Sequence, residues 1–337
     1  MNPTLSLLLR QLIDLDSTTG KEASVAEFVS NCLDRMGFRV LRQSVSGGRF
    51  NVFATLGDPV VVFSSHLDTV PDYFPFSEDD QFVYGRGACD AKGIIAAQIL
   101  AGKKLLEEGL SDFGFLFVVG EENGSDGAKA ANALPNRCRH LIHGEPTENK
   151  LALGSKGALR IVIETEGKSA HSAYPESGES AVLKLLDILH DLREMPMPVD
   201  SLLGTATMNI GTLGGGNRAN IVPDRARSEI FFRTVTDSGT VKAHVMQLIG
   251  SRAVCRTEFE CNPVVLDRME GFDTTVVSYT TDIPLLANWG RPILLGPGSI
   301  LDAHTSHEKI SKMELARGIV LYQRLCRGFL MGETTTE

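Results

Sequence analysis

The sequence lacks the features of a membrane-bound or nucleic-acid-binding protein. No apolar run approaches the roughly 20 residues needed to cross a bilayer. Leu5–Leu9 is a short apolar run, but Arg10 interrupts it and no small-residue cleavage site follows, so we expect a helix and not a signal peptide. Positive charge is in deficit, with a formal net charge of −9, which disfavours nucleic acid and anionic membranes as partners. A small polar substrate fits this composition better.

Paired cysteines are also missing. The six cysteines form no CxxC motif and no paired spacing. Disulfide-rich secreted domains need such pairing, whereas cytosolic thiols stay reduced, so we expect free thiols and a cytoplasmic protein. Cys89 stands next to Asp90, but we interpret it as a small packed residue, because hard carboxylate ligands are already close to it in the sequence.

Residues able to bind a metal follow the first strongly apolar segment. The run Val60–Phe63 predicts a buried strand that delivers His66 and Asp68 at its C-terminal end, where α/β sheets bind their ligands. Two residues apart in extended chain, these side chains point to the same side, so the carboxylate can orient the imidazole. Asp90 precedes the apolar run Gly93–Leu100, which predicts a buried helix with Asp90 near its N-terminus. These residues suggest a metal site.

Each residue has a plainer interpretation when taken alone. A single histidine at a strand end is more often a hydrogen-bonded structural residue, and a single aspartate before a helix is more often an N-cap. Three further apolar segments shift the balance, because acidic residues or a histidine follow each of them. Charged side chains directly after core strands are not exposed by default. These later residues are Glu121 and Glu122, Glu145, and His304.

Together these segments resemble the M20 family of zinc aminoacylases and peptidases, which includes acetylornithine deacetylase and succinyl-diaminopimelate desuccinylase. They follow the family's order over most of the chain, and the last is most similar to the acetylornithine deacetylase branch. The matching segments are Ser65–Pro71, Gly85–Gly93, Glu121–Glu122, Gly144–Thr147 and Gly296–His304.

The resemblance implies a centre of two zinc ions per subunit, in which cobalt can replace zinc. A pair of metal ions needs a bridging carboxylate and separate terminal ligands, and these residues supply them without a thiolate. Asp90 would bridge the two ions. One ion would be completed by His66 and Glu145, and the other by Glu122 and His304.

The resemblance also implies roles around the metal ions. Asp68 would fix the tautomer of His66, and Glu121 would be the general base that takes a proton from the metal-activated water and passes it to the leaving amine. It further implies a cis peptide at Asp90–Ala91.

Other residues near the motifs receive plainer interpretations. His307 competes with His304 for the ligand role, but the spacing from Gly296 favours His304, so we expect His307 at the surface or behind the ligands. We interpret His143 as structural, although it is close to Glu145. The acidic and polar segment Phe76–Tyr84 predicts a surface loop.

The length of 337 residues exceeds a comfortable single core. Strand-like and helix-like segments alternate as far as Leu141, which indicates an α/β sheet covered by helices on both faces. Between Leu159 and Cys261 the pattern becomes β-α-β-β-α-β, the ferredoxin-like arrangement. Because His304 belongs with the other ligands, the chain must return to the first sheet afterwards. We predict a mixed-sheet α/β/α catalytic domain of residues 1–155 and 266–337, with an inserted ferredoxin-like α+β lid and dimerisation domain at 156–265.

Candidate substrate-binding residues lie mainly in the inserted domain. His171 could be an exposed loop histidine, but the resemblance favours stabilisation of the oxyanion from a partner subunit. Asn220 lies in a segment that resembles the family segment whose asparagine contacts the substrate, whereas Asn217 and Arg218 could be turn residues. Arg233 could bind an α-carboxylate in bidentate fashion or be an ordinary strand arginine. Asp282 could face a substrate amine or be a surface carboxylate.

These residues predict a zinc-dependent hydrolase that cleaves the amide bond of a small N-acyl amino acid. Alternatives with the same site are an M20 dipeptidase, carboxypeptidase or desuccinylase. The segment Tyr279–Pro284 lacks the Gly-rich Thr-Ser-Asp-Gly sequence usual in desuccinylases and peptidases, which favours the acetylornithine branch. A non-catalytic metal-binding homologue would be expected to lose the base, so Glu121 argues against it. The resemblance also implies a homodimer formed through the inserted domain.

Overall fold

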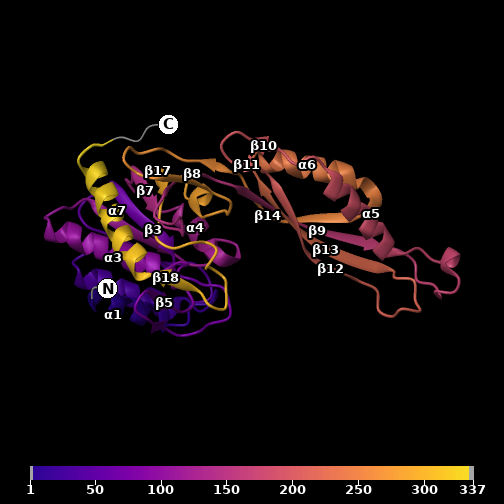
Figure 1. Ribbon diagram of the computed structural model, residues 1–337, viewed down its shortest axis with the longest axis horizontal. Coiled ribbons are helices and arrows are strands. Elements are labelled where there is room, and N and C mark those ends of the chain that lie inside the picture. The colour runs from indigo at the N-terminus through magenta and orange to yellow at the C-terminus, as the bar shows by residue number, and fades with distance from the viewer. Residues whose placement is uncertain (1–2, 334–337) are drawn as a thin grey trace. The chain divides into compact units, whose positions relative to one another are not determined.

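The computed structural model describes residues 3–333 and is shown in Figure 1. Its chain divides into two compact units. Unit 1 consists of residues 1–153, 266–275 and 281–337, and unit 2 consists of residues 154–265 and 276–280. The predicted boundaries at 155/156 and 265/266 lie close to these, except that residues 276–280 pack with unit 2. Among the described residues, no helix combines the length and the apolar character required to cross a membrane.

A mixed sheet forms the centre of unit 1. Its four inner strands, in the order β6-β3-β7-β17, are parallel to one another, and the strands beyond them are antiparallel. This mixed α/β architecture confirms the predicted fold class. In spatial order the strands are β1 (Arg39–Ser44), β2 (Phe50–Thr55), β6 (Phe113–Val118), β3 (Val61–His66), β7 (His140–His143), β17 (Arg291–Leu294) and β8 (Leu151–Ser155). The chain passes from unit 1 to unit 2 within β8, which also pairs with β15 (Val264–Val265) of unit 2 and with β16 (Thr274–Val277).

Alternation along the inner strands builds two apolar cores, one on each face of the sheet. Val61 and Phe63 of β3 pack into the larger core, whereas Val62 between them packs into the smaller one. Successive strand residues point to opposite faces, and fully apolar strands are therefore buried on both. The larger core receives α1 (Pro3–Ile13), α2 (Ala23–Arg35), α3 (Lys92–Glu107) and α7 (Lys312–Leu330), and the smaller receives α4 (Asp126–Ala131).

A small second sheet lies at the start of α7 and contradicts one expectation. The segment predicted as a surface loop, Phe76–Tyr84, contains two strands of this sheet. Its order is β18 (Lys309–Ser311), β5 (Phe82–Tyr84) and β4 (Ser77–Glu78). The polar residues of β4 are exposed, so the sequence showed no apolar strand pattern there. The helices α3 and α7 pack against each other beside this sheet (Figure 1).

Unit 2 has a four-stranded antiparallel sheet in the order β12-β13-β9-β14. Leu185, Ile188 and Leu192 of α5 recur at helical spacing and pack with α6 over one face of this sheet. Ser180 and Asp237 cap the two helices by accepting backbone N–H groups of Leu183 and Thr240. The elements follow the β-α-β-β-α-β succession: β9 (Gly157–Glu166), α5 (Ala181–Glu194), β12 (Thr207–Gly215), β13 (Arg225–Thr234), α6 (Ser238–Ile249) and β14 (Val254–Cys261), with a hairpin of β10 (Val199–Asp200) and β11 (Gly204–Thr205).

Candidate metal centre

The parallel strands of unit 1 bring four chain segments to one edge of the sheet. His66 is the last residue of β3, and Glu121 and Glu122 begin the 3₁₀ turn η1 (Glu121–Asn123) just after β6. Glu145 follows β7, and the segment after β17 leads to His304. Because these strands are neighbours and run in the same direction, their carboxyl ends meet there, as in other α/β sheets that bind ligands.

The turn after β6 is shaped so that Glu121 and Glu122 face this edge. Gly120 has φ +77°, a backbone conformation that L side chains rarely adopt, and a Cβ at this position would lie 2.2 Å from Asp126 Oδ1, so glycine is favoured there. The Asp68 carboxylate accepts the backbone N–H groups of Glu121 at 3.0 Å and Glu122 at 3.1 Å. Asp68 thereby anchors the turn from the neighbouring strand end.

Asp90 lies between two groups of side chains. Its Oδ1 atom is 2.9 Å from His66 Nε2, and its Oδ2 atom is 3.3 Å from His304 Nε2. Glu145 Oε1 is 3.8 Å from His66 Nε2, and Glu122 Oε1 is 2.9 Å from His304 Nε2. The five predicted ligands therefore converge as two histidine and glutamate pairs on either side of one aspartate.

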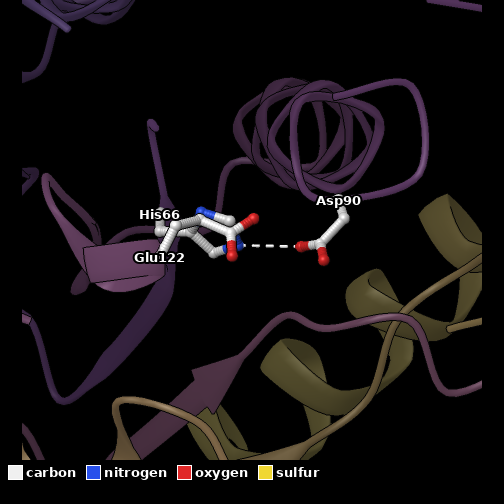
Figure 2. Close-up of side chains that lie close together, drawn as sticks. All are labelled: His66, Asp90 and Glu122. Atoms are coloured by element: carbon white, nitrogen blue, oxygen red, sulfur yellow. Dashed lines mark hydrogen bonds and ion pairs between the residues drawn. The ribbon is translucent and has the colours of Figure 1, made fainter. Parts of the chain in front are cut away.

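Three of these residues meet the geometry of a metal site directly. One ligand atom from each of His66, Asp90 and Glu122 lies within 4.8 Å of the others. Figure 2 shows the three side chains pointing toward one another, with the contact between His66 and Asp90 drawn as a dashed line. Imidazole nitrogen and carboxylate oxygen are donors that suit zinc. The Asp90–Ala91 peptide is cis, as the resemblance implied.

Cys89 does not add a thiolate to this set. Its side chain is fully buried and its Sγ lies 3.3 Å from the carbonyl oxygen of Ser299. Burial, together with the Asp90 charge, raises the pKa of the Cys89 thiol well above its usual value. The neutral, packed thiol matches the expectation for this residue.

Charge balance inside the cluster is incomplete without a cation. Burial raises the pKa of Glu145 to about 8 and that of Glu122 to about 7, although His66 and His304, respectively, oppose these shifts. Glu145 Oε1 is buried and has no hydrogen-bond partner among the described residues. A buried carboxylate without a partner is costly unless it is neutralised or binds a metal. These residues therefore fit a bound divalent cation.

The two histidines are tied to the central aspartate. Burial alone would lower the pKa of His66, but hydrogen bonds with Asp68 and Asp90 raise it well above the usual value. Hydrogen bonds with Asp90 and Glu122 raise the pKa of His304 to about 10. Burial disfavours the Asp90 carboxylate, yet hydrogen bonds from His304 and His66 outweigh this effect and lower its pKa. Protons thus occupy positions that metal ions can replace.

The contact between His66 and Asp68 differs in detail from the expected carboxylate–imidazole pair. His66 Nδ1 is 3.0 Å from the backbone carbonyl oxygen of Asp68 and 3.5 Å from its Oδ1 atom. The carbonyl oxygen can only accept, so it places the proton of a neutral His66 on Nδ1 and leaves Nε2 facing Asp90. The Asp68 carboxylate instead receives Thr19 Oγ1 at 2.8 Å as well as the η1 amides.

Glu121 lies beside the five converging residues without contacting them by a hydrogen bond that the structure shows. Burial raises the pKa of Glu121 well above its usual value, with the charges of Asp282 and Glu145 adding to the shift and His66 opposing it. A carboxyl group with a raised pKa suits proton transfer near neutral pH.

Two further ionisable residues are buried behind the cluster. His143 is fully buried, its Nδ1 lies 2.8 Å from Ser64 Oγ, and its Nε2 lies 3.5 Å from Glu145 Oε1. Burial lowers the pKa of His143 to about 4. Asp282 is also fully buried, and burial raises its pKa to about 6. The alternative that Asp282 is a surface carboxylate is therefore wrong, and a substrate amine reaches it only if the surrounding chain moves. His307, by contrast, is exposed.

The candidates of unit 2 occupy two places. His171 forms a β-bridge with Ile221, and Ser172 N–H donates to the carbonyl oxygen of Asn220, so the exposed His171 and Asn220 are close along paired segments. Arg233 lies near the end of β13, where its Nη1 donates to Thr280 Oγ1 at 3.2 Å and its guanidinium lies over the Phe231 ring. A hollow of about 340 Å³ on the sheet includes Arg233 in its lining.

Sequence reasoning missed a buried ion pair behind Asp90. Glu308 is fully buried and its Oε1 accepts the backbone N–H groups of Cys89 at 2.9 Å and Asp90 at 3.0 Å. Its Oε2 accepts Arg86 Nη1 at 2.8 Å. Arg86 lies within a motif that the resemblance used, but no pattern connected it with a glutamate more than 200 residues later.

The profile of the family described as Peptidase family M20/M25/M40 matches residues 62–328. A peptidase M20 domain-containing protein of Schizosaccharomyces pombe is 39% identical over 331 residues, covering 94% of this chain and 83% of that protein. A probable carboxypeptidase of Aspergillus clavatus is 36% identical over 368 residues, covering 95% of this chain and 81% of that protein.

Solved structures show the same fold. A tripeptidase of Staphylococcus aureus superposes with a TM-score of 0.80 at 21% identity, covering 96% of each chain. A Bacillus subtilis protein described as a dinuclear metal-binding peptidase from the M20 family has a TM-score of 0.70 at 15% identity, covering 97% of this chain and 98% of that one. The family match and the relatives above 30% identity show that the chain belongs to peptidase family M20/M25/M40 and is an enzyme of its metal-dependent amidohydrolase type.

Proposed function

We propose that this enzyme uses two metal ions to hydrolyse the amide bond that joins an acyl group to the amino nitrogen of an amino acid whose α-carboxylate is free. The observation that carries the proposal is the position of Asp90 between the His66–Glu145 pair and the Glu122–His304 pair. One carboxylate with its two oxygens directed at two separate ligand pairs is the arrangement that a two-metal site needs. The match in fold to a protein described as dinuclear metal-binding supports it.

This arrangement supports the following proposal for the metal ligands. His66 and Glu145 would hold one ion, Glu122 and His304 the other, and Asp90 both. A pair of zinc ions bound there, or cobalt in their place, would polarise the amide carbonyl and lower the pKa of water toward about 7. Asp68 would keep the turn that carries Glu122 in place through its two backbone hydrogen bonds.

Glu121 is proposed as the general base and acid. Its carboxylate takes a proton from the attacking water and gives it to the leaving nitrogen when the amide bond breaks. Asp68 holds the Glu121 backbone N–H at 3.0 Å, which fixes the start of the side chain beside the ligands. The raised pKa of Glu121 suits a group that must hold the proton between the two steps.

Three residues of unit 2 are proposed to bind substrate. His171 would donate a hydrogen bond to the oxygen that gains negative charge in the transition state. Arg233 would bind the α-carboxylate, because a guanidinium matches two carboxylate oxygens, and Asn220 would add a hydrogen bond to the substrate. Asp282 is a candidate counter-charge for a substrate amine. Because its side chain is buried, this role requires a movement of the surrounding chain.

A homodimer formed through unit 2 is part of the proposal. The helix α5 exposes Leu183 by 62% and Leu186 by 44%, and the edge strand β12 exposes Leu213 by 53%. Exposed apolar side chains and an open strand edge are features that a second copy can cover. The cytoplasmic location predicted from the cysteines stays a prediction.

Two classes of substrate, which differ in the acyl group, are candidates. The segment Tyr279–Pro284 favours an N-acetyl amino acid such as N-acetylornithine. The Aspergillus clavatus relative, a probable carboxypeptidase at 36% identity, favours a small peptide. Both substrates present the same C-terminal amino acid to the site, so the proposed ligands and Glu121 serve either.

The test is amine release from a panel of N-acetyl amino acids, N-succinyl amino acids and dipeptides. Protein treated with a chelator is compared with the same protein after zinc or cobalt is restored, and bound metal is counted in parallel. We expect two ions per chain and turnover that returns with them. Preference for N-acetylornithine supports the deacetylase candidate, and preference for dipeptides supports the peptidase candidate. Turnover of all substrates without metal would overturn the proposal.

A further inference from the structure

We propose that Glu308 is a positioning residue that fixes Asp90 and His304 at the spacing required for the second metal ion. The proposal rests on the proposed function, because it takes Asp90 and His304 as ligands. Glu308 itself is not a ligand, since both of its oxygens already accept hydrogen bonds from Arg86, Cys89 and Asp90.

The backbone of Glu308 is in register with the loop that leads to Asp90. The strand β18 begins with the next residue, Lys309, which pairs with Tyr84 of β5. The Glu308 carbonyl oxygen accepts the backbone N–H of Gly85 at 3.2 Å. This pairing places the Glu308 side chain beside residues 86–90.

The Glu308 side chain then holds the Asp90 backbone itself. Its Oε1 atom accepts two successive amide N–H groups, at 2.9 and 3.0 Å, and the second belongs to Asp90. Arg86 balances the buried charge, and Arg86 Nε in turn donates to the carbonyl oxygen of Asp72 at 3.0 Å. A buried carboxylate whose two oxygens both accept hydrogen bonds from fixed groups is held in one orientation.

His304 is connected to Glu308 through its contact with Asp90 and through the short stretch of chain between them. It lies four residues before Glu308, it has φ +60°, and half of its side chain is exposed. The side-chain contacts that the structure gives its ring are with Glu122 and Asp90. By contrast His66, at the end of β3, is only 1% exposed and is held by the sheet. Loss of Glu308 should therefore disturb the ion at Glu122 and His304 more than the ion at His66 and Glu145.

The experiment is calorimetric titration of metal-free protein with zinc. Glu308→Ala removes the acceptor, and Glu308→Gln keeps an oxygen that can still accept an amide N–H. We expect one of the two ions to bind about ten- to a hundred-fold more weakly in Glu308→Ala, with a smaller loss in Glu308→Gln. Glu107→Ala, which removes an exposed glutamate of α3, is the matched control and should bind both ions normally.

Two comparisons separate positioning from general damage. His304→Ala should weaken the same ion, and the double variant Glu308→Ala/His304→Ala should lose less than the two single losses combined. In metal-free protein, hydrogen exchange at the Asp90 amide should rise in Glu308→Ala and stay unchanged in His304→Ala. This second measurement holds even if activity is absent. If the alanine variant does not fold, the smaller rise expected in Glu308→Gln provides the test.

The outcomes are distinguishable. Wild-type protein that binds fewer than two ions would overturn the proposed function, whatever Glu308 does to the Asp90 amide. Two wild-type ions, with affinities in Glu308→Ala within about twofold of wild type, would overturn the positioning role. Unchanged exchange at the Asp90 amide in both Glu308 variants would overturn it as well.

Discussion

The candidate residues of unit 1 and unit 2 differ in what holds them. In unit 1 the ionisable residues are mostly buried, and each is tied to its neighbours by specific contacts, as Asp90 is to His66 and His304. In unit 2, His171 and Asn220 are exposed, and their hydrogen bonds are mainly those of their own loops. Burying charge is costly, so a buried cluster needs a chemical reason, whereas an exposed side chain needs none.

Burial therefore indicates a function for the cluster in unit 1 but not for the exposed residues of unit 2. The cluster around Asp90 is evidence in itself, because its carboxyl groups lack full compensation without a cation. The roles proposed for unit 2 rest on the family resemblance and on the chemistry of the side chains. Variants in the two units should therefore separate metal binding from substrate binding.

The largest effect should come from Glu121→Gln in unit 1. The amide cannot accept and return a proton, so we expect turnover to fall by about 10²–10⁴-fold. Metal content and affinity should stay at the wild-type level, because Glu121 contacts none of the proposed ligands by a hydrogen bond. Glu107→Gln is the charge-matched control. Loss of a metal ion in Glu121→Gln would instead show that Glu121 is a metal ligand.

His171→Ala should give the next largest effect, from unit 2. Removing one hydrogen-bond donor to a developing oxyanion lowers turnover by about 10²–10³-fold in other enzymes. We expect a loss of this size in kcat with metal binding unchanged, since His171 is outside the ligand set. His190→Ala, an exposed histidine of α5, is the control. A wild-type kcat in His171→Ala would show that His171 is an ordinary exposed loop residue without a role in catalysis.

Much of unit 1 could be predicted because strand ends carry a clear pattern. An apolar run that stops at His66 or before Glu121 is visible in the sequence, and parallel strands bring such ends together. Glu308 could not be found this way, because the pairing of β5 with β18, which brings Glu308 beside Asp90, joins segments that are distant in the sequence. Residues at strand ends could be identified from the local sequence, whereas contacts between distant loops depend on the tertiary structure.

Backbone hydrogen bonds account for the other differences. The Asp68 carboxylate was expected to orient His66; it lies 3.5 Å from His66 Nδ1 and also accepts the amides of Glu121 and Glu122. That arrangement depends on the left-handed conformation of Gly120, which the sequence permits but does not specify. Asp282 could be placed near the site by resemblance, but its full burial depends on the tertiary structure.

The smallest effect should come from Arg233→Lys, which tests substrate binding in unit 2. Lysine keeps the positive charge but cannot bind both oxygens of a carboxylate, so we expect KM to rise about tenfold, equivalent to roughly 1.4 kcal/mol, with kcat nearly unchanged. Arg227→Lys, on the same strand, is the matched control. The rise in KM should occur for N-acetyl amino acids and dipeptides alike, because both carry the α-carboxylate, and should vanish for substrates whose carboxylate is amidated. A wild-type KM for every free acid would show that Arg233 does not bind the substrate carboxylate and has a structural role, to which its contacts with Thr280 and Phe231 belong.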